Sequence, residues 1–414
     1  MITLNEATPS NLPFAKLEFN TALLMADGEQ PLKALLIVET DRVSAGVSDK
    51  PFRALSTASI EAIYGASSML SQMVSYWLKR VTTIPIYVLP MPLGSSANQL
   101  KTRLSPLQSQ MQFNFIVSAY NSPEHLSVLG RHLNEVSKAD SAREGLAFSA
   151  KSASFEEFFS FIQGGSAAAP SADDEDGSTS SPSAPVLGRE PINFKYVTCL
   201  ASPVIKYKAG DSAQLSTFPD SMLAVAYAAT VAVEAQKDPS RPFHALILPD
   251  VPAPDENSEF SPEQLSQLVD EGLSVYSVTY NREAMLMRLV TTYSKNEQGN
   301  PDKSFQDINI PLVTSRFRFS FVSYFFNKFI MQRYKLADDA TLPPAGARVI
   351  QPKTAKAEAF AVFSKWEEAQ YIEDAEALRK SLKVDKKDNY LLFSFEPNII
   401  EILLGVAGQA NLTR

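Results

Sequence analysis

Short apolar runs alternate with amphipathic stretches through the first half of the chain. Between the first two runs, apolar residues recur at helical spacing from Ile60 to Trp77. Ser122-Pro123-Glu124 has the signature of a helix start, and we expect that helix to reach about residue 138. The alternation predicts an α/β fold with an open mixed sheet flanked by helices. Its buried strands are expected at 34–38, at 84–89 (closed by Pro90 and Pro92), at 113–119 and at 146–149.

The texture changes at 164–188, where Ala, Ser, Pro, Gly and Asp dominate and no large apolar side chain occurs before Val186. Such a segment buries too little surface to offset its ordering entropy, so it is predicted to be a disordered loop. It fits either a linker between domains or an excursion from one domain. The α/β pattern resumes with a helix at 223–235 and a strand at 245–248, which favours one core domain over 26–293.

The last third of the chain has a different pattern. Two strands, 273–280 and 284–293, are joined by a sharp corner, and a polar loop follows. A helix rich in Phe and Arg is then expected at 311–333, and a helical pair at 355–382. These segments predict a helix-rich α+β C-terminal domain over 294–387. The last residues return to strand character, with apolar segments at 390–395 and 399–404, and 388–414 is expected to form a C-terminal arm.

Composition excludes some classes of function. Acidic residues outnumber basic ones 46 to 38, which argues against a protein that mainly binds nucleic acid. The single cysteine, Cys199, lies in an apolar run and is expected to be a buried structural thiol. The N-terminus lacks the features of an export signal, and the apolar stretch at 223–233 is too short to span a bilayer. We therefore expect a soluble protein of the cell interior, without membrane insertion.

Catalytic and cofactor motifs are absent from the sequence. No glycine pair forms G-x-G, and no phosphate-binding loop or nucleophile elbow occurs. His125 and His132 are two helical turns apart, too far for a local metal pair, and we expect no metal or cofactor. Asp338 and Asp339 are expected to cap a turn or to pair with Lys or Arg. An α/β enzyme with an unrecognised site stays open as the alternative.

A family resemblance covers most of the chain. The Arg- and aromatic-rich helix, the turn Lys335-Leu336-Ala337-Asp338-Asp339 and the A-E-A-x-A-x-F-x-x-W-E-E-A helix from 357 to 369 resemble the C-terminal part of tail sheath proteins of Mu-type contractile phages. Tyr64-Gly65-Ala66-Ser67-Ser68 and Arg288-Leu289-Val290-Thr291-Thr292-Tyr293 resemble earlier segments of that family. The match weakens at 93–113 and 164–188, and the short chain implies that a large protruding domain is missing or reduced.

The resemblance implies a structural subunit and not an enzyme. Such subunits stack in rings around a tail tube, and the sheath shortens to drive the tube through a host envelope. The implied partners are other copies of the chain, the tail tube protein, and baseplate and tail terminator proteins. The implied location is the virion tail, assembled in the host bacterial cytoplasm. A sheath subunit of a phage-derived injection particle would use the same physics.

The resemblance also implies that terminal arms, here 1–25 and 388–414, add strands to the sheets of neighbouring subunits. The alternative is that the last residues complete their own domain's sheet. Acidic residues of the C-terminal domain are expected to contact the tube or another subunit: Glu367, Glu368 and Glu373. The residues expected at the interface between subunits are Leu17, Phe19, Tyr390, Leu391, Leu392, Phe393, Phe395, Ile399, Ile400 and Leu403.

Overall fold

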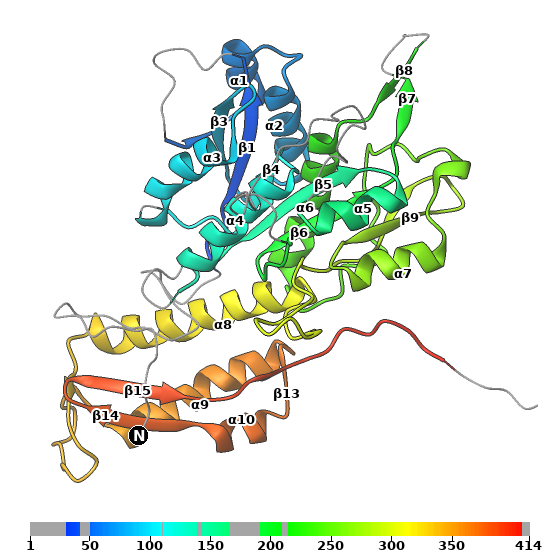
Figure 1. Ribbon diagram of the computed structural model, residues 1–414. Helices are drawn as coiled ribbons and strands as arrows, with labels where there is room; N and C mark the ends of the chain where they lie inside the picture. Colours follow the sequence, from blue (N-terminus) through cyan, green and yellow to red (C-terminus); the bar gives the residue numbers. More distant parts are fainter. Residues whose placement is uncertain are drawn as a thin grey trace, which may run out of the picture.

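The chain folds into an α/β domain and a C-terminal domain that lie on opposite sides of one long helix, α8 (Figure 1). The computed structural model describes residues 30–41, 50–109, 111–138, 143–164, 191–208 and 214–407. The predicted loop at 164–188 lies, beyond Gly164, outside the described residues.

A six-stranded sheet forms the centre of the α/β domain. Five neighbouring strands are parallel, and the edge strand β2 runs antiparallel to β3. β6 follows the predicted loop at 164–188 in the sequence and pairs with β5, which precedes that loop. The prediction of an open mixed sheet flanked by helices is confirmed. In spatial order the strands are β2 (Phe52–Arg53), β3 (Ile86–Pro92), β1 (Ala34–Thr40), β4 (Phe115–Ser118), β5 (Leu146–Ser152) and β6 (Val197–Ser202).

A hairpin extends this sheet beyond β6. The backbone N–H of Ala201 donates to Ser274 O at 2.8 Å, and that of Ser274 donates to Cys199 O at 2.9 Å. These bonds place β9 (Val275–Val278) beside β6, and β10 (Ala284–Arg288) pairs antiparallel with β9. The predicted corner at 281–283 is confirmed, with Arg282 at φ 60° in the turn.

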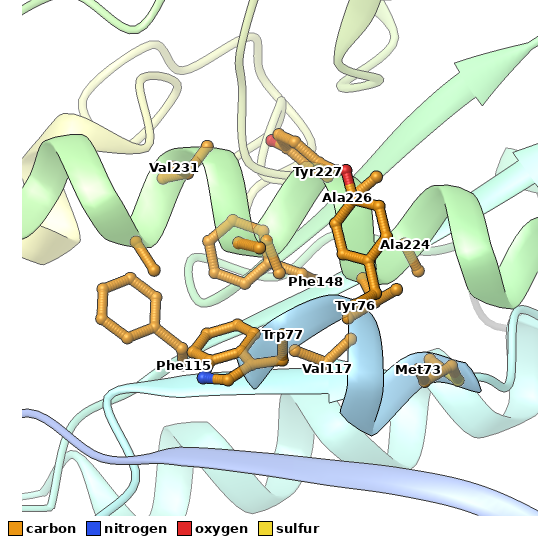
Figure 2. Close-up of a cluster of buried hydrophobic side chains, with 14 of the residues drawn as sticks. Met73, Tyr76, Trp77, Phe115, Val117, Phe148, Ala224, Ala226, Tyr227 and Val231 are labelled. Atoms are coloured by element: carbon orange, nitrogen blue, oxygen red, sulfur yellow. The ribbon is translucent and has the colours of Figure 1, made fainter. Parts of the chain in front are cut away.

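The two faces of the sheet bury two separate cores, because successive side chains of a strand point to opposite faces. In β1, Leu36 and Val38 join one core, whereas Leu35 and Ile37 join the other. Figure 2 shows the first core between β4, β5 and the helices α2 and α6. The first face is covered by α1 (Thr57–Tyr64), α2 (Met69–Arg80) and α6 (Asp220–Lys237), and the second by α3 (Ala97–Leu104), α4 (Pro123–Val136), α5 (Phe155–Ile162) and α7 (Pro262–Asp270).

Serine determines where many of these helices begin. A serine hydroxyl accepts a backbone N–H of the first turn, which satisfies a donor that the helix itself leaves unpaired. The predicted start of α4 is confirmed, with Ser122 at the N-cap and Pro123 first in the helix. The serine caps are Ser56, Ser68, Ser96, Ser122, Ser154 and Ser261.

The C-terminal domain packs on an aromatic core. Short strands and turns connect its helices, and the predicted long helix and helical pair are confirmed. Its elements are α8 (Asn309–Phe325) with a π-helical turn (Phe326–Ile330), β11 (Lys335–Leu336), β12 (Val349–Ile350), α9 (Pro352–Glu368), β13 (Ile372–Glu373), α10 (Ala375–Ser381), β14 (Lys383–Lys387), β15 (Tyr390–Ser394) and β16 (Asn398–Ile399). The remaining elements of the chain are the 3-10 turns Ser105–Ser109 and Glu256–Ser258, and the hairpin of β7 (Lys206–Lys208) with β8 (Leu215–Thr217).

Two details of the predicted elements are wrong. Pro90 and Pro92 do not close their strand, because β3 continues through both while pairing with β1. On its other side β3 meets β2 at Tyr87 and Val88, so the prolines lie where no backbone donor is needed on that side. The stretch at 245–248 forms an isolated bridge from Ile247 to Met285 instead of a strand. Ala245 at φ 59° breaks the extended backbone there.

Candidate assembly interfaces

The aromatic core of the C-terminal domain determines which predicted interface residues are free to meet a partner. Phe317 of α8 stacks on Trp366 of α9 with ring centroids 4.3 Å apart. Trp366 Nε1 donates to Ser320 Oγ at 2.8 Å, so the polar end of this buried indole is satisfied. Offset aromatic pairs of this kind contribute about 0.5–1.5 kcal/mol beyond the area they bury.

One face of the predicted C-terminal arm, up to Phe395, packs on this core. β15 pairs with β14 in a hairpin of the same chain. The ring of Phe395 lies 5.0 Å from Phe363, and Phe393 lies 4.8 Å from Phe325. Leu391 packs on the same side, because alternate residues of a strand share a face. A role for these residues between subunits stays a prediction, but they complete their own domain first.

The partner strand β14 was missed by the sequence reading, since its residues are mainly charged. The signal that could have found it is the two-residue connection Asp388-Asn389 between strands of equal length. Asp388 has φ 53°, and hairpin turns favour Asp and Asn where φ is positive. Within the described residues, β14 and β15 form a two-stranded sheet, so each has an outer edge without a further strand.

The chain beyond β16 has a different environment. Ile399 pairs with Ile372, and the backbone N–H of Ile400 donates to Tyr371 O at 3.2 Å. From Glu401 to Ala407 the segment runs away from the body of the molecule (Figure 1). Its apolar side chains are exposed: Leu403 to 66%, Leu404 to 60% and Val406 to 90%. This stretch is apolar without being covered by its own domain, which is the property expected of a segment that binds a partner.

The acidic residues of the C-terminal domain divide into paired and unpaired sets. Glu367 forms an ion pair with Arg379 at 2.6 Å. Glu376 pairs with Lys380 at 2.7 Å, and Asp374 caps α10 by accepting the N–H of Ala377 at 2.9 Å. The other two predicted contact residues are exposed on α9 and β13: Glu368 and Glu373. Contact of these acids with a tube or another subunit stays a prediction.

Asp338 and Asp339 stabilise the turn that follows α8. Asp338 forms an ion pair with Lys386 of β14 at 3.0 Å. Asp339 Oδ1 accepts the backbone N–H of Lys353, in the first turn of α9, at 3.0 Å. The prediction of a capping and pairing role is therefore confirmed, and both carboxylates have structural partners.

One serine–histidine pair requires comparison with an enzyme site. Ser122 Oγ lies 2.7 Å from His125 Nδ1. Ser122 is also the N-cap of α4, and the other ring nitrogen of His125 lies 3.0 Å from Ser95 O. The imidazole stacks on Tyr120, with centroids 4.4 Å apart. Ser122 Oγ also donates to Glu124 Oε2 at 2.7 Å and accepts the backbone N–H of His125 at 3.5 Å, so its contacts are those of a helix cap.

Other reactive groups have ordinary structural environments. Cys199 is fully buried in β6, and burial raises the pKa of its thiol, as expected for a structural cysteine. Burial lowers the pKa of His132 to about 4. No group of three metal-binding side chains occurs among the described residues. Within the same part of the chain, no helix has the length and apolar character needed to cross a membrane.

The N-terminal arm contains the remaining predicted interface residues, Leu17 and Phe19. Both lie outside the described residues.

Comparison with known proteins gives one relative in sequence and a clear fold. No protein-family model matches the chain. The Mu-like prophage FluMu tail sheath protein of Haemophilus influenzae is 30% identical over 171 residues, which are 41% of this chain and 34% of that protein. The match thus spans about a third of the relative's length, and the resemblance to tail sheath proteins stated from the sequence is confirmed.

Solved structures extend the likeness over almost the whole chain. The sheath tail protein of Listeria innocua superposes with a TM-score of 0.59 at 7% identity, covering 93% of this chain and 94% of that one. The helical sheath of the anti-feeding prophage in its contracted state superposes with a TM-score of 0.57 at 10% identity, covering 97% and 99%. At such identities the likeness shows the fold, and the fold is that of tail sheath proteins.

Proposed function

We propose that this chain is the structural subunit of a contractile tail sheath, which polymerises around a tail tube and contracts to drive the tube through a host envelope. The fold shared with sheath proteins along nearly the whole chain carries this proposal. In this role the chain is not an enzyme. Its partners are other copies of itself, the tube, and baseplate and terminator proteins, and its place is a virion tail assembled in the host cytoplasm.

The exposed C-terminal segment supports the proposal at the level of residues. If it extends as a strand, Ile400, Ile402, Leu404 and Val406 share one face. A strand with one wholly aliphatic face is suited to an open sheet edge, where backbone bonds give affinity and side-chain contacts give register. The β14–β15 hairpin of a neighbouring copy offers such edges. The binding segment of the arm therefore begins at about residue 400, beyond the part that completes its own domain.

A phage-derived injection particle is the second candidate. It is favoured by the superposition on the anti-feeding prophage sheath, and it would use the same subunit contacts. The genes that neighbour this one would separate the two: a capsid and genome-packaging set indicates a phage.

Electron microscopy of the purified protein tests the proposal. Wild-type protein is expected to form tubes, and the double variant Leu404→Asp/Val406→Asp is expected to lose them. Burying one leucine contributes about 1.5–3 kcal/mol, and a carboxylate on the same face must also be desolvated. The matched control is Leu342→Asp, because Leu342 is 90% exposed in a loop outside the arm.

Thermal unfolding shows whether a variant loses tubes because its fold is destabilised or because its arm no longer binds. All these side chains are exposed, so each variant should unfold within about 0.5 kcal/mol of wild type. Normal tubes from the double variant would refute the role of the arm. Wild-type protein that forms no tubes, with or without a tube protein, would count against the sheath function itself.

A further inference from the structure

Helix α8 is shared by the two domains, and its two sides make different kinds of contact. Toward the C-terminal domain the contacts are mainly apolar, with Phe317, Phe321 and Phe325 in the aromatic core. Figure 1 shows the helix lying between α9, β14 and β15 on one side and the α/β domain on the other. Hydrophobic contact is non-directional and keeps α8 attached to the C-terminal domain.

Toward the α/β domain, α8 packs Leu312 against the first core and also makes several buried polar contacts. Asn309 Nδ2 donates to the carbonyl oxygens of Pro239 and Arg241, each at 2.8 Å. Gln30 Nε2 donates to Ser315 Oγ at 3.0 Å in a buried position. One turn further along α8, Arg318 forms an ion pair with Glu144, which lies just before β5.

The Glu144–Arg318 pair has an unusual location for two charges. The side chain of Glu144 is 3% exposed and that of Arg318 6% exposed. Gln112 Nε2 donates to the backbone oxygen of Glu144 at 3.1 Å, which helps to hold this residue in place. A buried ion pair is weak support for stability, because the two charges lose their hydration, but their attraction is strong only in a narrow range of geometries.

Ser315 and Arg318 are three residues apart and therefore lie on the same face of α8. Their partners come from the start of the described chain and from the edge of β5. The predicted N-terminal arm ends a few residues before Gln30. One face of α8 thus contacts both Gln30, at the start of the described chain, and Glu144 of the α/β domain.

We propose that Glu144–Arg318, together with Gln30–Ser315, is an orientation lock between the two domains. It fixes the direction in which the N-terminal arm leaves relative to the β14–β15 hairpin and the C-terminal arm. This inference rests on the proposed sheath function, because a lattice joined by arms needs both arms at a set angle. Loss of the lock leaves two folded domains whose relative orientation varies.

Distance measurement between spin labels on the full-length protein tests the lock. Lys101 of α3 and Glu368 of α9 are exposed, and cysteines placed there carry one label on each domain. Cys199 is fully buried, so it does not compete for the label. Wild type should give one narrow distance distribution, and Glu144→Gln should lose it in favour of a broad one.

The matched control is Glu358→Gln, which removes an ion pair with Lys328 inside the C-terminal domain. It should keep the narrow distribution. The exchanged pair Glu144→Arg/Arg318→Glu should restore at least part of it. A narrow distribution in folded Glu144→Gln would overturn the lock. Global unfolding of Glu144→Gln would overturn it too, since the pair would then stabilise the fold and not the orientation.

Diluting the labelled protein with unlabelled protein keeps the measured distances within one chain, so the result does not depend on tube formation. If Glu144→Gln loses the narrow distance distribution and wild-type protein never forms tubes, the result would support the lock and count against the sheath function. If wild-type protein forms tubes and Glu144→Gln keeps the narrow distribution, the result would support the sheath function and overturn the lock.

Discussion

Substitution of Phe395 by Ala tests where the C-terminal domain ends and its arm begins. Phe395 is 9% exposed, and its ring centroid lies 5.2 Å from Phe321, 5.0 Å from Phe363 and 6.0 Å from Trp366. Removing a fully buried Phe ring costs about 3–5 kcal/mol, through lost burial and the cavity left behind. Because a small part of this ring is exposed, we expect the lower end, about 3 kcal/mol.

The two tryptophans make the measurement specific. Trp77 lies in the core of the α/β domain and Trp366 in the core of the C-terminal domain. In a Trp77→Phe background, urea unfolding followed by fluorescence therefore reports on Trp366. Phe395→Ala should move this transition to lower urea, whereas Leu404→Ala, at an exposed position of the arm, should leave it unchanged within about 0.5 kcal/mol.

The opposite result would refute the reasoning. If Phe395→Ala leaves the transition of Trp366 in place, Phe395 does not contribute to its own domain. The arm would then begin near residue 388, as the sequence predicts, and deletion of 388–414 would leave a stable domain. If the transition moves as expected, that deletion should destabilise the domain, and the informative truncation is the one after Ile400.

Two further predictions concern charge. Glu368→Lys/Glu373→Lys should weaken tube assembly at low salt while the melting temperature stays close to that of wild type, because both side chains are exposed; normal assembly at low salt would show a solvated surface. The pKa of His132 is lowered to about 4, so below its ordinary value of 6.5 the unfolded chain binds a proton that the folded chain does not. Stability should fall between pH 6.5 and 4, by about 2 kcal/mol at pH 5, and His132→Gln should unfold with a smaller loss between pH 7 and pH 5.

Much of the fold could be predicted because buried apolar residues recur at regular intervals in the sequence. Successive side chains of β1 enter the two cores in turn. The uninterrupted aliphatic run from 34 to 38 therefore indicates a strand buried on both faces of the sheet. The start of α4 follows from Ser122 and Pro123, whose local chemistry determines the cap. Such features depend on neighbours in the sequence, so a reader of the sequence can find them.

The details that were wrong or missed depend on distant neighbours. A proline ends a strand only if its missing N–H faces a partner, and the sequence around Pro90 does not say where β2 ends. β14 is charged and offers little apolar signal, yet it pairs along its whole length with β15. The shared face of α8 was equally hidden, since Gln30, Glu144 and Arg318 are far apart in the chain.

The C-terminal residues show how far a sequence can indicate an assembly surface. An alternation of apolar residues indicates that these side chains are buried in the functional protein. It does not indicate whether they are buried by the same chain or by a partner. At 390–395 the aromatic core of the domain covers one face of the strand, that of Leu391, Phe393 and Phe395. At 403–406 the same kind of pattern remains exposed in the folded chain. These exposed side chains support the proposal that the binding segment of the arm lies beyond residue 400, a distinction that requires both the sequence and the structure.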